Sequence, residues 1–120
     1  MVWLKRILLV LAIICLGTII DYIAHQIDPR FSVPSSYFPH KILYGTLWAF
    51  AGYLVFKKYL NTPFKLALVL SATPAIILQI IYIINGHLFL WVSFLFMVLH
   101  FLMFLLPGFY ICRKYQSVFN

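Results

Sequence analysis

The strongest constraint on this fold is the presence of four long, mostly apolar segments in a chain of only 120 residues. A transmembrane helix needs about 17 to 25 such residues, because each residue adds about 1.5 Å along the helix axis. The segments cover residues 4–22, 42–59, 65–84 and 88–111. The sequence therefore predicts four transmembrane helices, one for each segment. The third helix is expected to start at Thr62 and Pro63, because a threonine hydroxyl can cap free N–H groups and a proline at the first helical position removes no hydrogen bond.

The composition excludes an ordinary water-soluble domain. Hydrophobic residues make up 65% of the chain and charged residues 9%, and the mean hydropathy is +1.03. Soluble domains carry roughly 25% charged residues. The net charge of +7 comes from nine basic residues that lie at the ends of the apolar segments or between them, against two acids. Because this distribution is typical of membrane topology, we expect a lipid bilayer as the environment and no nucleic-acid partner.

The basic residues predict the orientation of the chain in the membrane. When successive connections are assigned to alternate sides, seven basic residues share the side of both termini and two fall on the other side. The seven are Lys5, Arg6, Lys57, Lys58, Lys65, Arg113 and Lys114, and the two are Arg30 and Lys41. Since basic residues concentrate on the cytoplasmic side, we expect a cytoplasmic (inner) membrane protein with both termini in the cytoplasm.

The connections complete the predicted fold, which is an all-α integral membrane protein with a single domain over residues 1–120. The first connection, 23–41, forms a long outer loop that contains three prolines, which interrupt regular structure. Asn85 and Gly86 predict a tight outer turn, because glycine tolerates the left-handed conformation that ends many helices. The four helices are thus expected to form an antiparallel bundle.

Small residues recur at short helical spacing in two of the predicted helices. They are Gly45, Ala49 and Gly52 in the second helix, and Ala67, Ser71 and Ala75 in the third. Such stripes allow helix backbones to approach closely inside a membrane. We expect them to pack within the bundle of one chain, and contact between two copies is the alternative.

A cluster of potential metal ligands lies on the outer side. Asp21, His25 and Asp28 are spaced by four and three residues, so they share one face if the first helix continues to Pro29. His40 precedes the second helix. Carboxylate and imidazole groups together bind Zn, Fe or Cu, so a transition metal is the cofactor that these four residues suggest. The favoured alternative is a solvated, hydrogen-bonded loop without metal.

A second candidate site surrounds His100, near the middle of the fourth helix and about 18 Å below its outer end at 1.5 Å per residue. An ionisable side chain at that depth normally faces the bundle interior and has a partner. The favoured partner is the carbonyl of Leu70, whose helical hydrogen bond is removed by Pro74. The alternative is a proton- or solute-handling site, lined by His100, Tyr53, Thr73 and Gln79.

Three functions fit these features. The favoured one is a structural or accessory subunit without enzymatic activity, which joins other membrane subunits or a second copy of itself. The first alternative is a metal-dependent enzyme at the outer membrane interface that uses the Asp21, His25, Asp28 and His40 cluster. The second is a small oligomeric transporter or channel component built around His100.

Overall fold

The described part of the chain is built from helices. The computed structural model describes residues 2–27, 37–84 and 90–119, and no strand occurs in these ranges. The elements are α1 (Val2–Ile27), α2 (Tyr37–Phe56), the short 3-10 helix η2 (Lys57–Tyr59), α3 (Pro63–Ile84), α4 (Leu90–Lys114) and α5 (Gln116–Phe119). The prediction of an all-α protein is therefore confirmed for the described residues.

Three described helices are long and apolar enough to cross a membrane. They are α1 along its whole length, Pro63–Ile81 of α3 and Met97–Lys114 of α4. The predicted span 42–59 falls in α2 and η2, which do not meet the same test. The start of α2 carries Pro39, His40 and Lys41, which lower its hydropathy. The length and hydropathy of these three helices thus indicate a membrane protein. That α2 also crosses the membrane stays a prediction.

The first two helices are longer on the outer side than the sequence predicted. α1 ends at Ile27 instead of residue 22, and α2 begins at Tyr37 instead of residue 42, so both helices enter the predicted loop 23–41. Pro39 is compatible with α2 because it lies in the first turn, where N–H groups have no helical acceptor. The other two prolines of that loop and the predicted turn at Asn85 and Gly86 lie outside the described residues.

The start of α3 agrees with the sequence. Thr62 precedes the helix, and its hydroxyl accepts a hydrogen bond from the backbone N–H of Lys65 at 3.2 Å. Pro63 occupies the first helical position, where the missing N–H removes no helical hydrogen bond. These two residues fix where the chain re-enters the apolar region.

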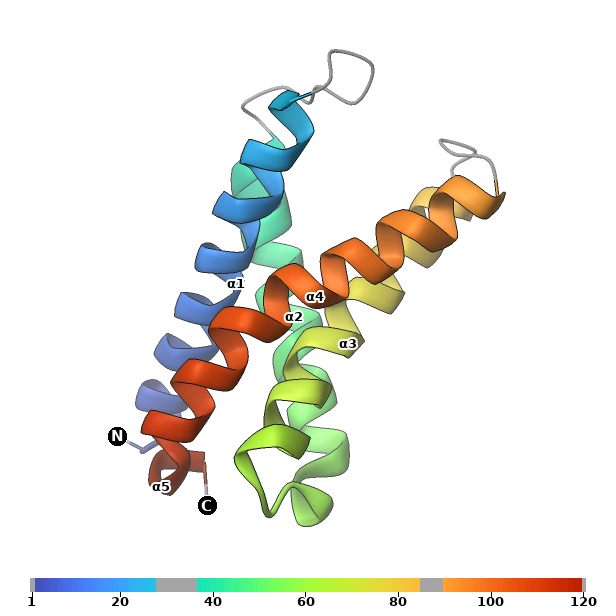
Figure 1. The fold of residues 1–120 in the computed structure, drawn as a ribbon. Helices are drawn as coiled ribbons and strands as arrows, with labels where there is room; N and C mark the ends of the chain where they lie inside the picture. The colour runs from blue at the N-terminus through green and yellow to red at the C-terminus, as the bar shows by residue number, and fades with distance from the viewer. Residues whose placement is uncertain (1, 28–36, 85–89, 120) are drawn as a thin grey trace.

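The helices are arranged as two pairs that cross each other (Figure 1). α1 lies beside α2, α3 lies beside α4, and further contacts join α1 to α4 and α2 to α3. α1 and α4 cross at Gly17, where an added Cβ atom would lie 2.2 Å from the ring of Phe104. The absence of a side chain at Gly17 therefore sets how closely these two helices approach.

The predicted stripes of small residues face neighbouring helices of the same chain. Gly45 lies against Ile14 of α1, and Gly52 lies against Thr73 of α3. The four other stripe residues, Ala49, Ala67, Ser71 and Ala75, are fully buried. These contacts correspond to packing within one chain.

Both termini lie at the same end of the molecule (Figure 1). Arg6 of α1 donates a hydrogen bond from Nε to the carbonyl of Val118 at 2.7 Å. The hydroxyl of Tyr53 donates to the carbonyl of Phe119 at 3.0 Å. These two bonds hold α5 against the ends of α1 and α2.

Candidate metal centre

The centre of the site is Asp21 on α1. Its side chain is only 3% exposed, although it lies six residues before Ile27, the last residue of the helix. His25 follows one turn later on the same helix face, and its Nε2 atom lies 3.4 Å from Oδ1 of Asp21. The spacing of four residues brings these side chains together, because residues i and i+4 are neighbours on a helix surface.

The third member of the site is His100 on α4. Its Nε2 atom lies 2.9 Å from Oδ1 of Asp21, and its side chain is 3% exposed. The contact between Gly17 and Phe104 explains this meeting. Asp21 lies one turn beyond Gly17 on α1, and His100 lies one turn before Phe104 on the antiparallel α4. The close crossing therefore places the two polar side chains opposite each other.

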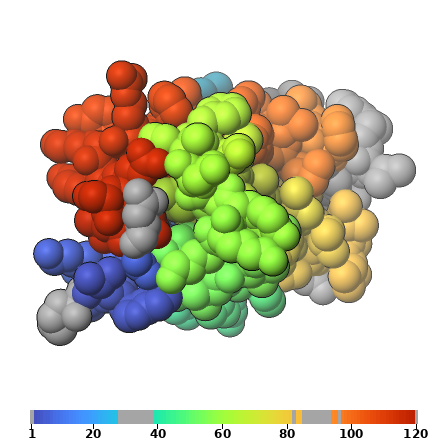
Figure 2. Space-filling model, turned by 90° about the horizontal axis from the view of Figure 1, so that it is seen from below, coloured from blue at the N-terminus to red at the C-terminus, as the bar shows by residue number. Residues whose placement is uncertain are grey.

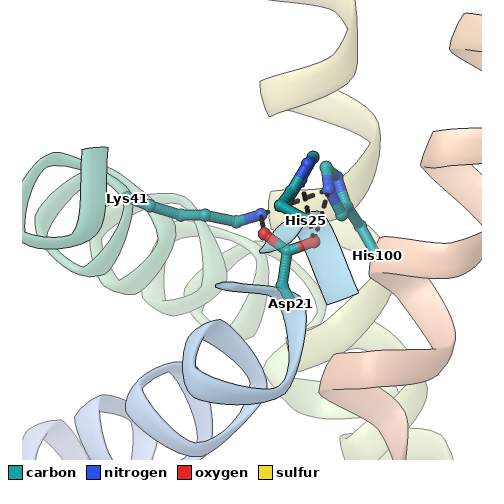
Figure 3. Close-up of polar contacts among 4 residues, drawn as sticks. All are labelled: Asp21, His25, Lys41 and His100. Carbon is teal, nitrogen blue, oxygen red and sulfur yellow. Dashed lines mark hydrogen bonds and ion pairs between the residues drawn. The ribbon is translucent and has the colours of Figure 1, made fainter. Parts of the chain in front are cut away.

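The fourth member is Lys41, near the start of α2. Its ammonium group forms a buried ion pair with Oδ2 of Asp21. The same Nζ atom lies 3.2 Å from Nε2 of His100. Three helices thus contribute to one buried polar group of Asp21, His25, Lys41 and His100 (Figure 3). We call these four residues the polar cluster.

The two carboxylate oxygens of Asp21 have different neighbours. Oδ2 faces the ammonium of Lys41, and Oδ1 faces Nε2 of both histidines. The three atoms that could bind a metal, one each from Asp21, His25 and His100, all lie within 4.8 Å of one another. The carboxylate can therefore keep its ion pair through one oxygen while the other oxygen shares a cation with two imidazoles.

Nε2 of His100 has two neighbours with opposite hydrogen-bonding requirements. The carboxylate of Asp21 accepts hydrogen bonds, whereas the ammonium of Lys41 only donates them. Nε2 is either a donor, which suits Asp21, or an acceptor, which suits Lys41. A metal cation between Oδ1 and the two Nε2 atoms would suit both histidines as neutral ligands and leave Lys41 bonded to Oδ2.

One carboxylate and two imidazoles form a known kind of metal-binding set. Catalytic zinc sites use three protein ligands of this type and leave the fourth position to water or substrate. Two histidines and one carboxylate also bind non-haem Fe(II). Lys41 would act on the second oxygen of Asp21, and such partners orient the carboxylate of a metal ligand. The described residues therefore fit a transition metal with an open coordination position.

The structure brings together only part of the predicted metal set. Asp21 and His25 lie in the polar cluster, whereas His40 is exposed and stacks on the ring of Tyr44 at 6.3 Å between ring centroids. His40 and Lys41 are adjacent on α2, so their side chains leave the helix in different directions. Lys41 therefore faces Asp21 and His40 does not. Asp28 lies outside the described residues.

The predicted surroundings of His100 differ from those observed. Its described partners are Asp21 and Lys41 on α1 and α2, whereas we expected the Leu70 carbonyl on α3. Tyr53 lies near Arg6, with the guanidinium 5.9 Å from its ring centroid. Arg6 and Asp21 are separated by about 22 Å along α1, at 1.5 Å per residue. Tyr53 therefore cannot line a site at His100.

The other two residues predicted around His100 are on α3. Thr73 packs on Gly52. Gln79 is 1% exposed, and neither end of its amide has a hydrogen-bond partner among the described residues. Within the described ranges, no hydrogen bond or ion pair joins either residue to the polar cluster.

Sequence reasoning missed Lys41 and treated His100 as a separate site. It placed Asp21 at the membrane surface and His100 about 18 Å deeper, because it ended the first helix at residue 22. A signal for the longer helix was present, since no proline or glycine occurs between Asp21 and Asp28. No comparable feature of the sequence predicted that α1 packs against α4.

Comparison with protein-family models, with curated proteins and with solved structures gives no match to this chain. The functional argument therefore depends on the geometry of the polar cluster.

Proposed function

We propose that this protein is a metal-dependent membrane protein that binds one divalent transition-metal ion through Asp21, His25 and His100. The observation that carries the proposal is the convergence of three ligand atoms within 4.8 Å in a buried position. The open coordination position of such a set suits activation of water or binding of a substrate group, as in an enzyme at the outer membrane interface.

The burial of charge supports this function over that of an accessory subunit. Asp21 and Lys41 are each 3% exposed, and ionisable groups inside membrane segments are costly and usually functional. A subunit that only packs against partners needs no such group. A carrier built around His100 is also less well supported, because Tyr53, one of its expected lining residues, lies near the opposite end of the molecule.

The proposal includes four membrane crossings with both termini in the cytoplasm. The location of both termini at one end of the molecule supports an even number of crossings (Figure 1). Seven of nine basic residues fall on that side when α2 is counted as a crossing. The polar cluster then lies near the outer side, about 9 Å below the end of α1, at 1.5 Å per residue.

Metal binding by the purified protein tests this function. The protein is stripped with a chelator in mild detergent, titrated with Zn²⁺ or Co²⁺, and analysed for bound metal and for the visible absorption of Co²⁺. We expect one ion per chain in the parent protein. His25→Gln and His100→Gln should each weaken binding by about 10-fold or more, since loss of a direct ligand exceeds the loss measured for its supporting partners.

The matched control is His40→Gln, which makes the same change at an exposed histidine of α2, outside the polar cluster. It should leave metal affinity unchanged. The proposal is wrong if the parent protein binds no metal, or if His40→Gln lowers the affinity as much as His25→Gln. Thermal unfolding of each variant without metal shows whether a loss of binding reflects a loss of fold.

A further inference from the structure

A second site lies at the end of the molecule that holds both termini. A pocket of about 480 Å³ opens there, and its lining includes Lys57, Lys58 and Phe119. Figure 2 shows this end, with the green connection between α2 and α3 near the red C-terminal segment and the blue start of α1. We call this pocket the basic pocket. It is far from the polar cluster, because the carbonyl of Phe119 accepts a hydrogen bond from Tyr53, which lies near Arg6 at the start of α1.

The basic pocket has a positive charge that no acidic side chain of the described residues balances. The sequence contains only two acidic side chains, Asp21 and Asp28, and Asp21 lies near the opposite end of α1. Lys57 and Lys58 therefore have no acidic side chain within reach from the described residues. The pocket also includes Asn61, two residues before α3, whose N-terminal end adds partial positive charge. An anionic group is the complementary ligand.

Aromatic rings hold both lysine side chains at this end. Nζ of Lys57 lies 4.8 Å from the ring centroid of Trp3, and Nζ of Lys58 lies 5.0 Å from that of Tyr59. Contacts of this kind attract a cation to the face of the ring and limit its positions. Tryptophan and tyrosine are also typical of the membrane interface, where lipid headgroups lie. The cationic groups are thus placed at headgroup level.

The wall of the basic pocket is apolar on the side of α2. Leu54 and Val55 line it and are 49% and 70% exposed. They continue the apolar outer surface of α2, which includes Leu47. A free phosphate ion would contact only the polar end of the pocket, whereas an acyl chain would also cover this wall. The pocket therefore combines an anion-binding end with a lipid-binding side.

We propose that the basic pocket binds an anionic phospholipid of the cytoplasmic leaflet. Its phosphate lies against Lys57 and Lys58, and its acyl chains follow Leu54 and Val55. This site is independent of the metal centre, because it shares no residue with the polar cluster. It ties the connection between α2 and α3 to the membrane surface.

Lipid binding to the full chain in detergent tests the proposal. Native mass spectrometry measures the affinity for phosphatidylglycerol and for phosphatidylcholine, and thermal unfolding measures the stabilisation by each. The variant Lys57→Gln with Lys58→Gln removes the two cations of the pocket. The matched control, Arg113→Gln with Lys114→Gln, removes two exposed cations from the end of α4, which does not line the pocket.

The parent should prefer phosphatidylglycerol. The pocket variant should bind it about 30-fold more weakly, and the control variant about as tightly as the parent, given the typical contribution of each basic residue near an anionic surface. If both variants lose the same affinity for phosphatidylglycerol, the loss reflects the general surface charge, and the proposal of a lipid site in the basic pocket is wrong. Equal protection by inorganic phosphate at the same concentration would assign the site to a soluble anion and would also overturn the proposal.

Discussion

The ion pair between Asp21 and Lys41 leads to a quantitative prediction about stability. Each of the two side chains is 3% exposed. The substitution Asp21→Asn keeps the shape of the side chain but removes its negative charge. The ammonium of Lys41 then stays buried but loses the carboxylate with which it forms its ion pair, and the two neighbouring imidazoles carry no negative charge that could replace it. We expect this single change to destabilise the fold strongly.

The expected loss can be estimated from electrostatics. Two unit charges about 4 Å apart interact by about 4 kcal/mol at an effective dielectric constant of about 20. Removal of one partner from a buried pair costs about 3 to 5 kcal/mol in proteins, since the other charge remains buried. When Lys41→Met is combined with Asp21→Asn, both charges of this ion pair are removed. The double variant should therefore lie within about 1 kcal/mol of the parent, because neutral replacement of a buried pair is often tolerated.

A double-mutant cycle measures this coupling. The parent, both single variants and the double variant are unfolded reversibly in mixed micelles with increasing denaturing detergent, in the presence of a chelator so that metal does not contribute. Lys41→Met alone should cost less than Asp21→Asn, because His100 lies 2.9 Å from the carboxylate and can compensate it by taking up a proton. The coupling energy should be at least about 2 kcal/mol. If the two single effects simply add, the buried charge of Lys41 does not control stability and the reasoning is refuted.

Two further predictions concern the helix crossing and the topology. Gly17→Ala would place a Cβ atom 2.2 Å from the ring of Phe104. It should cost about 1 to 3 kcal/mol of stability, as overpacking does, and should weaken metal binding; unchanged stability would show that the crossing is not close. Single cysteines at Gln26 and Thr62, in a background without the two native cysteines, should differ in labelling of intact cells with a membrane-impermeant thiol reagent. Gln26→Cys should label from outside and Thr62→Cys only after the membrane is opened, and the reverse pattern would contradict the proposed orientation.

The local features of the fold could be predicted from the sequence because they depend on neighbouring residues. Apolar runs predicted the helices, and Thr62 and Pro63 predicted the start of α3, which the structure has at Pro63. The spacing of Asp21 and His25 placed both on one face of a helix, and the structure brings their side chains within 3.4 Å. Each of these inferences uses only helix geometry or the chemistry of a helix end.

The ends of the helices on the outer side were less predictable. The sequence placed residues 23–41 in a loop because three prolines occur there, but α1 continues to Ile27 and α2 begins at Tyr37. A proline in the first turn of a helix does not break it, so the prediction of a loop at Pro39 was wrong. The predicted end of the first helix at residue 22 put Asp21 at the membrane surface and separated it from His100.

Only the tertiary structure determined that Asp21, Lys41 and His100 form one site. The membrane helices are apolar on most sides, so their sequences do not show which face meets another helix. Which faces meet depends on side-chain packing between distant segments, such as the close contact of Gly17 with Phe104. That contact sets the register of α1 against α4, and one turn further along each helix it brings the carboxylate and the imidazole within 2.9 Å. The sequence supplied the residues that can bind a metal, and the crossing of the helices decided which of them can do so together.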